Sequence, residues 1–283
     1  MSRDGSVETW PVPIKQLEGL PSTIAERILA SFPVFPSCVR LPPERSSLFK
    51  KQAPRYVCWD EDHLLVLDVR GHAYYPVEVL FRNIIAWEYG VNLLVAWIQV
   101  FYGTEELLLQ MNTVGLDLFD DLLTRLKAVG PARGNAAPSM VDISFLKSDD
   151  YKYFTYGSEL LKEVGADSFF YHPRALADHS GFIRSHFLSY LFLKNERNII
   201  LLSANLTLRN RWSTPDYSII RHFIPRHQGE TMIITVPSEK SGIGFITLSV
   251  GNRLVYRCPY HRSYQETVEA FRVSCTGSEN MVR

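Results

Sequence analysis

The stretch Tyr56–Gly71, YVCWDEDHLLVLDVRG, decides the fold of this chain. Apolar, β-branched and aromatic residues stand on both sides of the acidic triplet Asp60–Asp62, which is typical of two strands joined by a tight turn. Further apolar runs follow as far as Met111, with breaks at Gly90 and Gly103. Their connections are too short for a crossover helix, so the stretch predicts an antiparallel meander.

The apolar period changes from that of a strand to that of a helix after these runs. Between Val114 and Val129 the apolar residues recur at helical spacing, and these are Leu116, Phe119, Leu123 and Leu126. A helix with one apolar stripe has to bury that stripe against a partner. We therefore expect an amphipathic helix that packs on the sheet and closes the first module.

A second block with the same plan occupies residues 188–275, compared with 55–129 for the first. Strands are predicted from Phe187–Leu193 to Leu254–Cys258. The last helix carries an apolar face made of Tyr264, Val268, Phe271 and Cys275. Residue identity between the blocks is low, so the repeat is one of pattern. The predicted fold class is α+β, mostly β, with two similar modules that each end in an amphipathic helix.

The segment 130–139, GPARGNAAPS, is rich in small residues and nearly uncharged, which is typical of a linker. Beyond it, a short helix is predicted at Ser158–Val164 and a strand at Ser168–Tyr171. The predicted division is an N-terminal extension with a short helix at 1–37, a first domain at 38–130, a linker at 131–139, and a second domain with an N-terminal insertion at 140–283.

The strand pair YVCWDEDHLLVLDVRG (56–71), the segment NIIAWEYG (83–90) and the helix that follows resemble the pleckstrin-homology-like (PH-like) modules of bacterial proteins. In the second block, NIILLSANLTL (198–208) and IIRHFIPRH (219–227) stand in the corresponding places. The resemblance implies two antiparallel β-barrels or sandwiches, each with a helix at one open end. It also implies a noncatalytic role, because such modules bind lipid head groups, peptides or other proteins.

The composition narrows the class of protein. The chain has 283 residues, 46% of them hydrophobic, and its 30 basic residues balance 30 acidic ones. It therefore lacks the positive charge that drives nonspecific nucleic-acid binding, and no nucleic-acid partner is expected. The N-terminal MSRDGSVETWPVP has no apolar run that would form a secretory signal. The apolar run 84–103 is interpreted as two strands that turn at Gly90–Asn92, and not as a transmembrane segment. These features predict a cytoplasmic protein.

The cysteines give no sign of a disulfide framework or a metal site. Cys38, Cys58, Cys258 and Cys275 lie far apart in the sequence and form no CxxC pair. We interpret them as buried thiols of a reducing compartment. The chain also has no phosphate-binding loop, and no cofactor is expected.

The local charge indicates a binding surface in the second domain. Between residues 184 and 227, seven basic residues stand against only Glu196 and Asp216. Because arginine forks bind oxyanions, this domain is predicted to recognise an anionic group, such as a phosphate or an anionic lipid, or a protein partner. The predicted contact residues are Arg209, Arg211, Arg221 and Arg226.

Two other functions remain open at this point. His172, His179 and His186 lie seven residues apart, and a hydrolase or metal-dependent enzyme is conceivable around them. His222 and His227 are five apart on a predicted strand, so they point to opposite faces and are not expected to share a metal ion. The other alternative is a structural homo-oligomer, and a large apolar interface would indicate this function.

Overall fold

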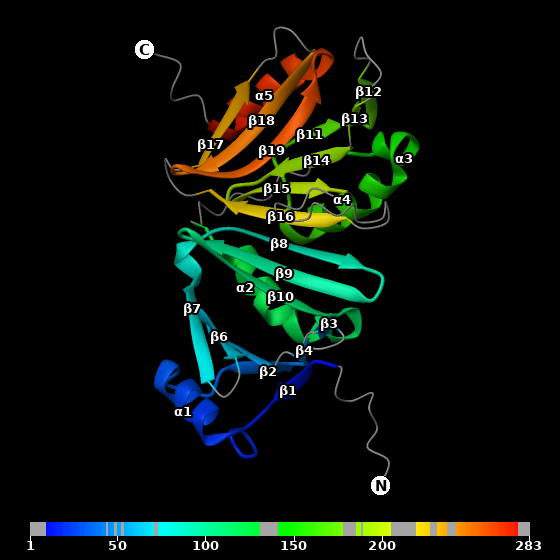
Figure 1. Ribbon diagram of the computed structural model, residues 1–283. Helices are drawn as coiled ribbons and strands as arrows, with labels where there is room; N and C mark the ends of the chain where they lie inside the picture. The colour runs from blue at the N-terminus through cyan, green and yellow to red at the C-terminus, as the bar shows by residue number, and fades with distance from the viewer. Residues whose placement is uncertain are drawn as a thin grey trace. The chain divides into compact units, whose positions relative to one another are not determined.

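The computed structural model describes the chain in two compact units. The described residues are 10–43, 45–47, 50–51, 54–70, 73–130, 141–177, 185–187, 189–204, 219–226, 231–236 and 242–276. Unit 1 comprises Met1–Ile84 and Val91–Val129, and unit 2 comprises Ile85–Gly90 and Gly130–Arg283. The fold is α+β and mostly β, as predicted, and its two largest antiparallel sheets have five and seven strands (Figure 1).

The chain passes from unit 1 to unit 2 at Gly130, which is also where the predicted first domain ends. Unit 1 differs from the predicted first domain at residues 85–90, which group with unit 2 although their sequence neighbours on both sides belong to unit 1. The predicted linker 131–139 lies outside the described residues. The division into a first and a second domain stays a prediction.

The main sheet of unit 1 has the strand order β1-β2-β5-β6-β7. Its strands are β1 (Val12–Ile14), β2 (Ser37–Leu41), β5 (Arg55–Trp59), β6 (His63–Arg70) and β7 (Ala73–Leu80), and a short pair, β3 (Arg45–Ser47) and β4 (Lys50–Lys51), precedes β5. Between β5 and β6, Oδ1 of Asp60 accepts hydrogen bonds from the backbone N–H groups of Asp62 and His63, each at 2.9 Å. The predicted strand pair and its acidic turn are confirmed.

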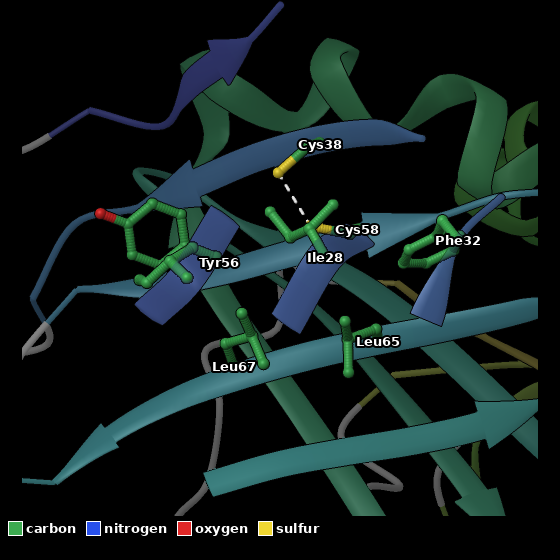
Figure 2. Close-up of a cluster of buried hydrophobic side chains, with 8 residues drawn as sticks. Ile28, Phe32, Cys38, Tyr56, Cys58, Leu65 and Leu67 are labelled. Carbon is green, nitrogen blue, oxygen red and sulfur yellow. Dashed lines mark hydrogen bonds between the residues drawn. The ribbon is translucent and has the colours of Figure 1, made fainter. Parts of the chain in front are cut away.

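Helix α1 (Ser22–Ser31) packs on this sheet and forms the first core cluster with it (Figure 2). The helix buries Ile24 and Ile28, and Phe32 follows at its end. The sheet contributes five buried side chains, namely Cys38, Tyr56, Cys58, Leu65 and Leu67. The predicted helix in the N-terminal extension is therefore confirmed. It lies on the sheet because its apolar stripe has to be buried against a partner.

Strands β9 (Val95–Tyr102) and β10 (Glu105–Asn112) form a hairpin in unit 1, and the turn between them passes through Gly103 at φ 49°. A 3-10 segment, Thr113–Phe119, leads into helix α2 (Asp120–Ala128). The apolar stripe of this region is buried and comprises Phe119, Leu122, Leu123 and Leu126. The predicted closing helix is confirmed, although its first turns are 3-10 and not α.

The turn before β9 corrects one prediction. Strand β8 (Ile84–Asn92) continues through Gly90, so the chain turns at Leu93 and Leu94 and not at Gly90–Asn92. Leu93 has φ 51°, a left-handed conformation that favours glycine or asparagine. No helix among the described residues is long and apolar enough to cross a bilayer.

In unit 2 the strands run in the order β8-β16-β15-β14-β11. After residues 85–90 of β8 come β16 (Ile220–Pro225), β15 (Asn198–Ser203), β14 (Tyr190–Lys194) and β11 (Ser168–His172). A separate three-stranded sheet consists of β17 (Thr231–Val236), β18 (Ile243–Val250) and β19 (Arg253–His261). Strands β12 (Ala175–Ala177) and β13 (Ser185–Phe187) form a further short pair. Every residue of β15 is buried, as expected of a central strand.

The described part of unit 2 contains three α-helices. The predicted insertion holds α3 (Leu146–Asp149) and α4 (Tyr151–Val164), which is longer than the predicted Ser158–Val164. The longer helix begins where the carboxylate of Asp150 accepts from the backbone N–H of Tyr153. The last helix, α5 (Gln265–Thr276), packs against β17 and β11 (Figure 1). The predicted C-terminal helix is therefore confirmed.

The closing helices of the two units begin in the same way. Asn112 ends β10, and its side chain accepts from the backbone N–H of Val114 at the start of the 3-10 segment before α2. His261 ends β19, and its side chain accepts from the backbone N–H of Ser263 before α5. This shared order of strand, 3-10 turn and helix agrees with the expected plan. Closed barrels, a tandem repeat and a PH-like identity stay predictions.

Candidate functional site

Arg221, one of the four predicted anion-binding arginines, lies on β16 among side chains of unit 2. Its guanidinium carbon is 5.0 Å from the ring centre of Tyr89 and 5.1 Å from that of Tyr156. Its Nη2 atom is 3.4 Å from a carboxylate oxygen of Glu159. Arg221 therefore already has an acidic partner and two aromatic neighbours.

Arg226, the residue after β16, joins two backbone segments. Its Nη1 donates to the carbonyl of Asn195 at 3.2 Å, and its Nη2 donates to the carbonyl of Cys275 at 3.0 Å. The second bond satisfies a carbonyl in the last turn of α5, where a cation is favourable. Arg221 and Arg226 thus contact two different sets of residues. Arg209 and Arg211 lie outside the described residues.

A buried polar network lies in the interior of unit 2. Oγ of Ser203 is 2.8 Å from Nε2 of His222, and Nδ1 of His222 is 2.8 Å from Oε2 of Glu88. The hydroxyl of Tyr256 donates to the same carboxylate oxygen at 2.7 Å. Ser203, His222 and Glu88 each have no exposed surface. These side chains join four strands, namely β8, β15, β16 and β19.

The strand register explains why these residues meet. His222 on β16 stands directly opposite Glu88 on β8, and the next pair, Phe223 and Trp87, stacks on the other face at 4.1 Å between ring centres. Alternation along both strands therefore separates a polar pair from an aromatic pair. The sequence holds a signal for this network, since Glu88 and His222 each interrupt an apolar run. The sequence analysis did not connect them.

The network has the order of groups found in serine hydrolases, with a hydroxyl, an imidazole and a carboxylate in line. Two features distinguish it from a reactive site. Ser203 is fully buried, and Tyr256 occupies the carboxylate oxygen that also faces His222. Burial and the nearby Glu88 raise the pKa of Tyr256 well above its usual range, so its hydroxyl stays protonated and donates. These contacts indicate that the network holds the strands together.

Of the three histidines of the alternative hypothesis, only His172 has a described side chain. His172 is buried in β11, where its Nε2 accepts from the backbone N–H of His261 at 3.1 Å. Burial lowers the pKa of His172 to about 4. His179 and His227 lie outside the described residues, as does the side chain of His186. Among the described residues, no group of three or more His, Cys, Asp or Glu side chains is placed to hold a metal ion.

Five exposed large apolar side chains of unit 1 lie on three segments that are in contact, and this set is here called the apolar tip: Trp10, Leu93, Leu94, Val95 and Val114. Leu93 is 80% exposed and Leu94 is 70% exposed. The backbone N–H of Thr113 donates to the carbonyl of Leu94 at 3.1 Å, which holds the two chain segments together.

Pro11 brings the third segment of the apolar tip into place. It packs on Gly115 so closely that a Cβ atom on Gly115 would lie 2.4 Å from Cγ of Pro11. Trp10 and Val114 are the sequence neighbours of these two residues. The segments 10–14, 89–104 and 107–116 contain no charged residue, so the apolar tip is uncharged as well as exposed. The absence of charge along each segment can be seen in the sequence, but the contact between the segments cannot.

Comparison with known proteins adds no relative. No protein-family model matches the chain, and no curated protein matches it.

Proposed function

We propose that the protein is a noncatalytic binding protein that attaches to a lipid bilayer through the apolar tip. The observation that carries the proposal is the pair of leucines at the two-residue turn before β9, both largely exposed. Trp10, Val95 and Val114 extend this exposed apolar surface. The polar network around His222, by contrast, is buried and links strands of unit 2.

The backbone at Leu93 supports a role for its side chain. A left-handed conformation costs a residue with a Cβ atom about 1–2 kcal/mol, and glycine or asparagine would avoid much of this cost. An exposed leucine gains nothing in the isolated protein that offsets this cost. Binding of Leu93 to an apolar medium would offset it, because burying a leucine side chain contributes about 1.5–3 kcal/mol.

The shape and chemistry of the apolar tip favour a bilayer over a protein surface. A stable protein interface uses roughly 20–30 residues on each side and requires complementary shape. The apolar tip offers five side chains on a hairpin turn and its neighbours. A bilayer needs no complementary shape, and tryptophan with aliphatic residues is the composition found at membrane interfaces. The absence of charge in the surrounding segments removes the cost of bringing ions to the hydrocarbon boundary.

The test is co-sedimentation of the full chain with phosphatidylcholine vesicles, using a variant that carries Leu93→Gly and Leu94→Ser. Glycine and a small polar residue suit this turn, so the variant keeps its fold. We expect the variant to bind vesicles about tenfold more weakly or worse, and we expect binding of the natural chain to change little with salt. Val34→Ser is the matched control, because Val34 is 76% exposed in unit 1 but lies outside the apolar tip.

Equal binding by the natural chain and the tip variant would overturn the proposal, as would no binding to any vesicle. Binding that requires phosphatidylserine and is lost with salt would instead point to the predicted set of Arg209, Arg211, Arg221 and Arg226. That anion site stays a separate proposal. Two of its residues, Arg221 and Arg226, already make contacts within unit 2. A stable dimer that buries Leu93 and Leu94 would favour a protein partner over a bilayer.

A further inference from the structure

Two of the four cysteines face each other across the sheet of unit 1. Cys38 on β2 stands directly opposite Cys58 on β5, and their sulfur atoms are 2.9 Å apart (Figure 2). Both are free thiols in this structure. Their separation of 20 residues gives no hint of this pairing, because strand register alone brings them together.

We infer that Cys38 and Cys58 form a reversible disulfide that responds to the redox state of small thiols. Directly opposed residues in an antiparallel pair have Cβ atoms about 4.5–5.5 Å apart, and the lower end of this range meets the upper end of the range of about 3.5–4.5 Å that a disulfide spans. The sulfurs need to approach by only about 0.9 Å to reach the covalent distance. The facing side chains are thus already close to the geometry of the bonded form.

The other two cysteines provide an internal contrast. Cys258 lies in β19 and Cys275 in α5, and both are buried. Burial raises the pKa of both thiols, and the hydrogen bond with Cys38 and burial raise the pKa of Cys58 as well, so the difference from the facing pair lies in position and not in ionisation. Neither faces another cysteine in the described residues. We expect both to stay thiols under conditions that oxidise the facing pair.

Helix α1 controls access to the pair. Ile28 belongs to the same core cluster as the two cysteines (Figure 2), and Cys38 is only 4% exposed while Cys58 has no exposed surface. The ends of α1 are weakly held, because it has no side-chain cap at its start, no acidic residue in its first turn and no basic residue in its last. Transient lifting of α1 would therefore open the pair to an oxidant.

The oxidant is a low-molecular-weight disulfide. Cys38 is the first nucleophile, because it keeps 4% of its surface exposed whereas Cys58 has none. Its thiolate attacks one sulfur of the small disulfide, whose S–S bond breaks and releases one small thiolate. The thiolate of Cys58 then attacks the sulfur of Cys38, and the second small thiolate leaves. The protein loses two electrons and two protons, and the small disulfide becomes two thiols.

The main test incubates the full chain in buffers that range from reduced to oxidised glutathione. We expect a species lighter by two hydrogens, with a peptide map that links Cys38 to Cys58 and leaves Cys258 and Cys275 open to alkylation. Because the bond closes a loop of about 20 residues, the oxidised protein should unfold roughly 5 °C higher or more, and reductant should reverse the shift. Four thiols at every glutathione ratio, or a link to Cys258 or Cys275, would overturn the inference.

Two matched pairs of variants test the order of events. Cys58→Ser should stop at a glutathione adduct on Cys38, whereas Cys38→Ser should acquire no adduct. Ile28→Ala should speed oxidation several-fold by loosening α1, and Leu29→Ala should not, because Leu29 is 57% exposed on the same helix. An adduct on Cys58 in the Cys38→Ser variant, or equal oxidation rates in the two α1 variants, would contradict the proposed route.

Discussion

Glu88 and His222 place an acid and an imidazole directly opposite each other in the interior of unit 2. Each has a hydrogen-bonded partner, yet Oε1 of Glu88 has none among the described residues. A buried polar pair of this kind is costly to break and less costly to replace as a whole. The sequence shows that both residues interrupt apolar runs. It does not show that they meet, because a register between strands 134 residues apart joins them.

Replacing one member of this network should destabilise the protein more than replacing two. Glu88→Ala leaves His222 and Tyr256 without their shared acceptor, so we expect the free energy of unfolding to fall by about 3 kcal/mol. The double variant Glu88→Leu with His222→Phe should recover part of this loss, because the carboxylate and the imidazole that faces it are removed together. Adding Ser203→Ala and Tyr256→Phe removes the two hydroxyls that these groups had paired. Urea unfolding of the two variants measures the difference. A double variant less stable than the single one would contradict this account.

His172 should make unit 2 less stable in acid. Burial, with a smaller effect from the nearby His261, lowers the pKa of His172 to about 4 in the folded protein, whereas an unfolded chain has a histidine pKa of about 6.5. The unfolded state therefore binds the proton more tightly, and stability falls as pH drops from about 6.5 to 4, by up to about 3 kcal/mol. His172→Gln keeps an acceptor for the backbone N–H of His261 but cannot titrate there. Urea unfolding from pH 7 to pH 4 should show a shallower loss for this variant, and an equal loss would rule out His172 as the cause.

At the scale of elements, the helices follow the sequence closely and one turn does not. The amphipathic periods of α2 and α5 are local, so they were predictable from spacing alone. Trp59 on β5 adds a bond from its indole N–H to the carboxylate of Asp121 in α2, at 2.8 Å, which fixes the helix on the sheet. The turn at Leu93 was placed wrongly, because turn rules favour the glycine three residues earlier. This turn between β8 and β9 contributes two exposed leucines, Leu93 and Leu94, to the apolar tip.

A single substitution separates strain from binding at this turn. Leu93→Gly removes the steric cost of φ 51°, so we expect the free energy of unfolding to rise by about 0.5–1 kcal/mol. The same change removes an exposed leucine, so vesicle binding should weaken at the same time. Leu29→Gly, in the interior of α1, should instead lower stability by about 1 kcal/mol. Thermal unfolding and vesicle co-sedimentation on the same samples give both readouts, and a loss of stability in Leu93→Gly would contradict the strain argument.

At the scale of the whole molecule, the units are not continuous in sequence. The linker-like composition of 130–139 predicts a boundary there, and composition cannot reveal that residues 85–90 pair with a strand more than a hundred residues later. Those six residues bring Glu88 to His222 and Trp87 to Phe223. Of the predicted anion-binding residues, Arg209 and Arg211 lie outside the described residues, and no local pattern in the sequence indicates that Arg221 contacts Glu159 or that Arg226 contacts the end of α5.

The fragment 130–283 should therefore not fold by itself as unit 2. Without β8 it loses the ring that stacks on Phe223 and the carboxylate that accepts from Tyr256, and it exposes the edge of β16. We expect the fragment to aggregate or to exchange the amide protons of β16 rapidly, under conditions in which the full chain protects them. A fragment that begins at residue 84 keeps β8 and is the matched comparison. Hydrogen exchange on both fragments and the full chain decides the matter, since equal protection of β16 in the 130–283 fragment would show that β8 is dispensable for the fold of unit 2.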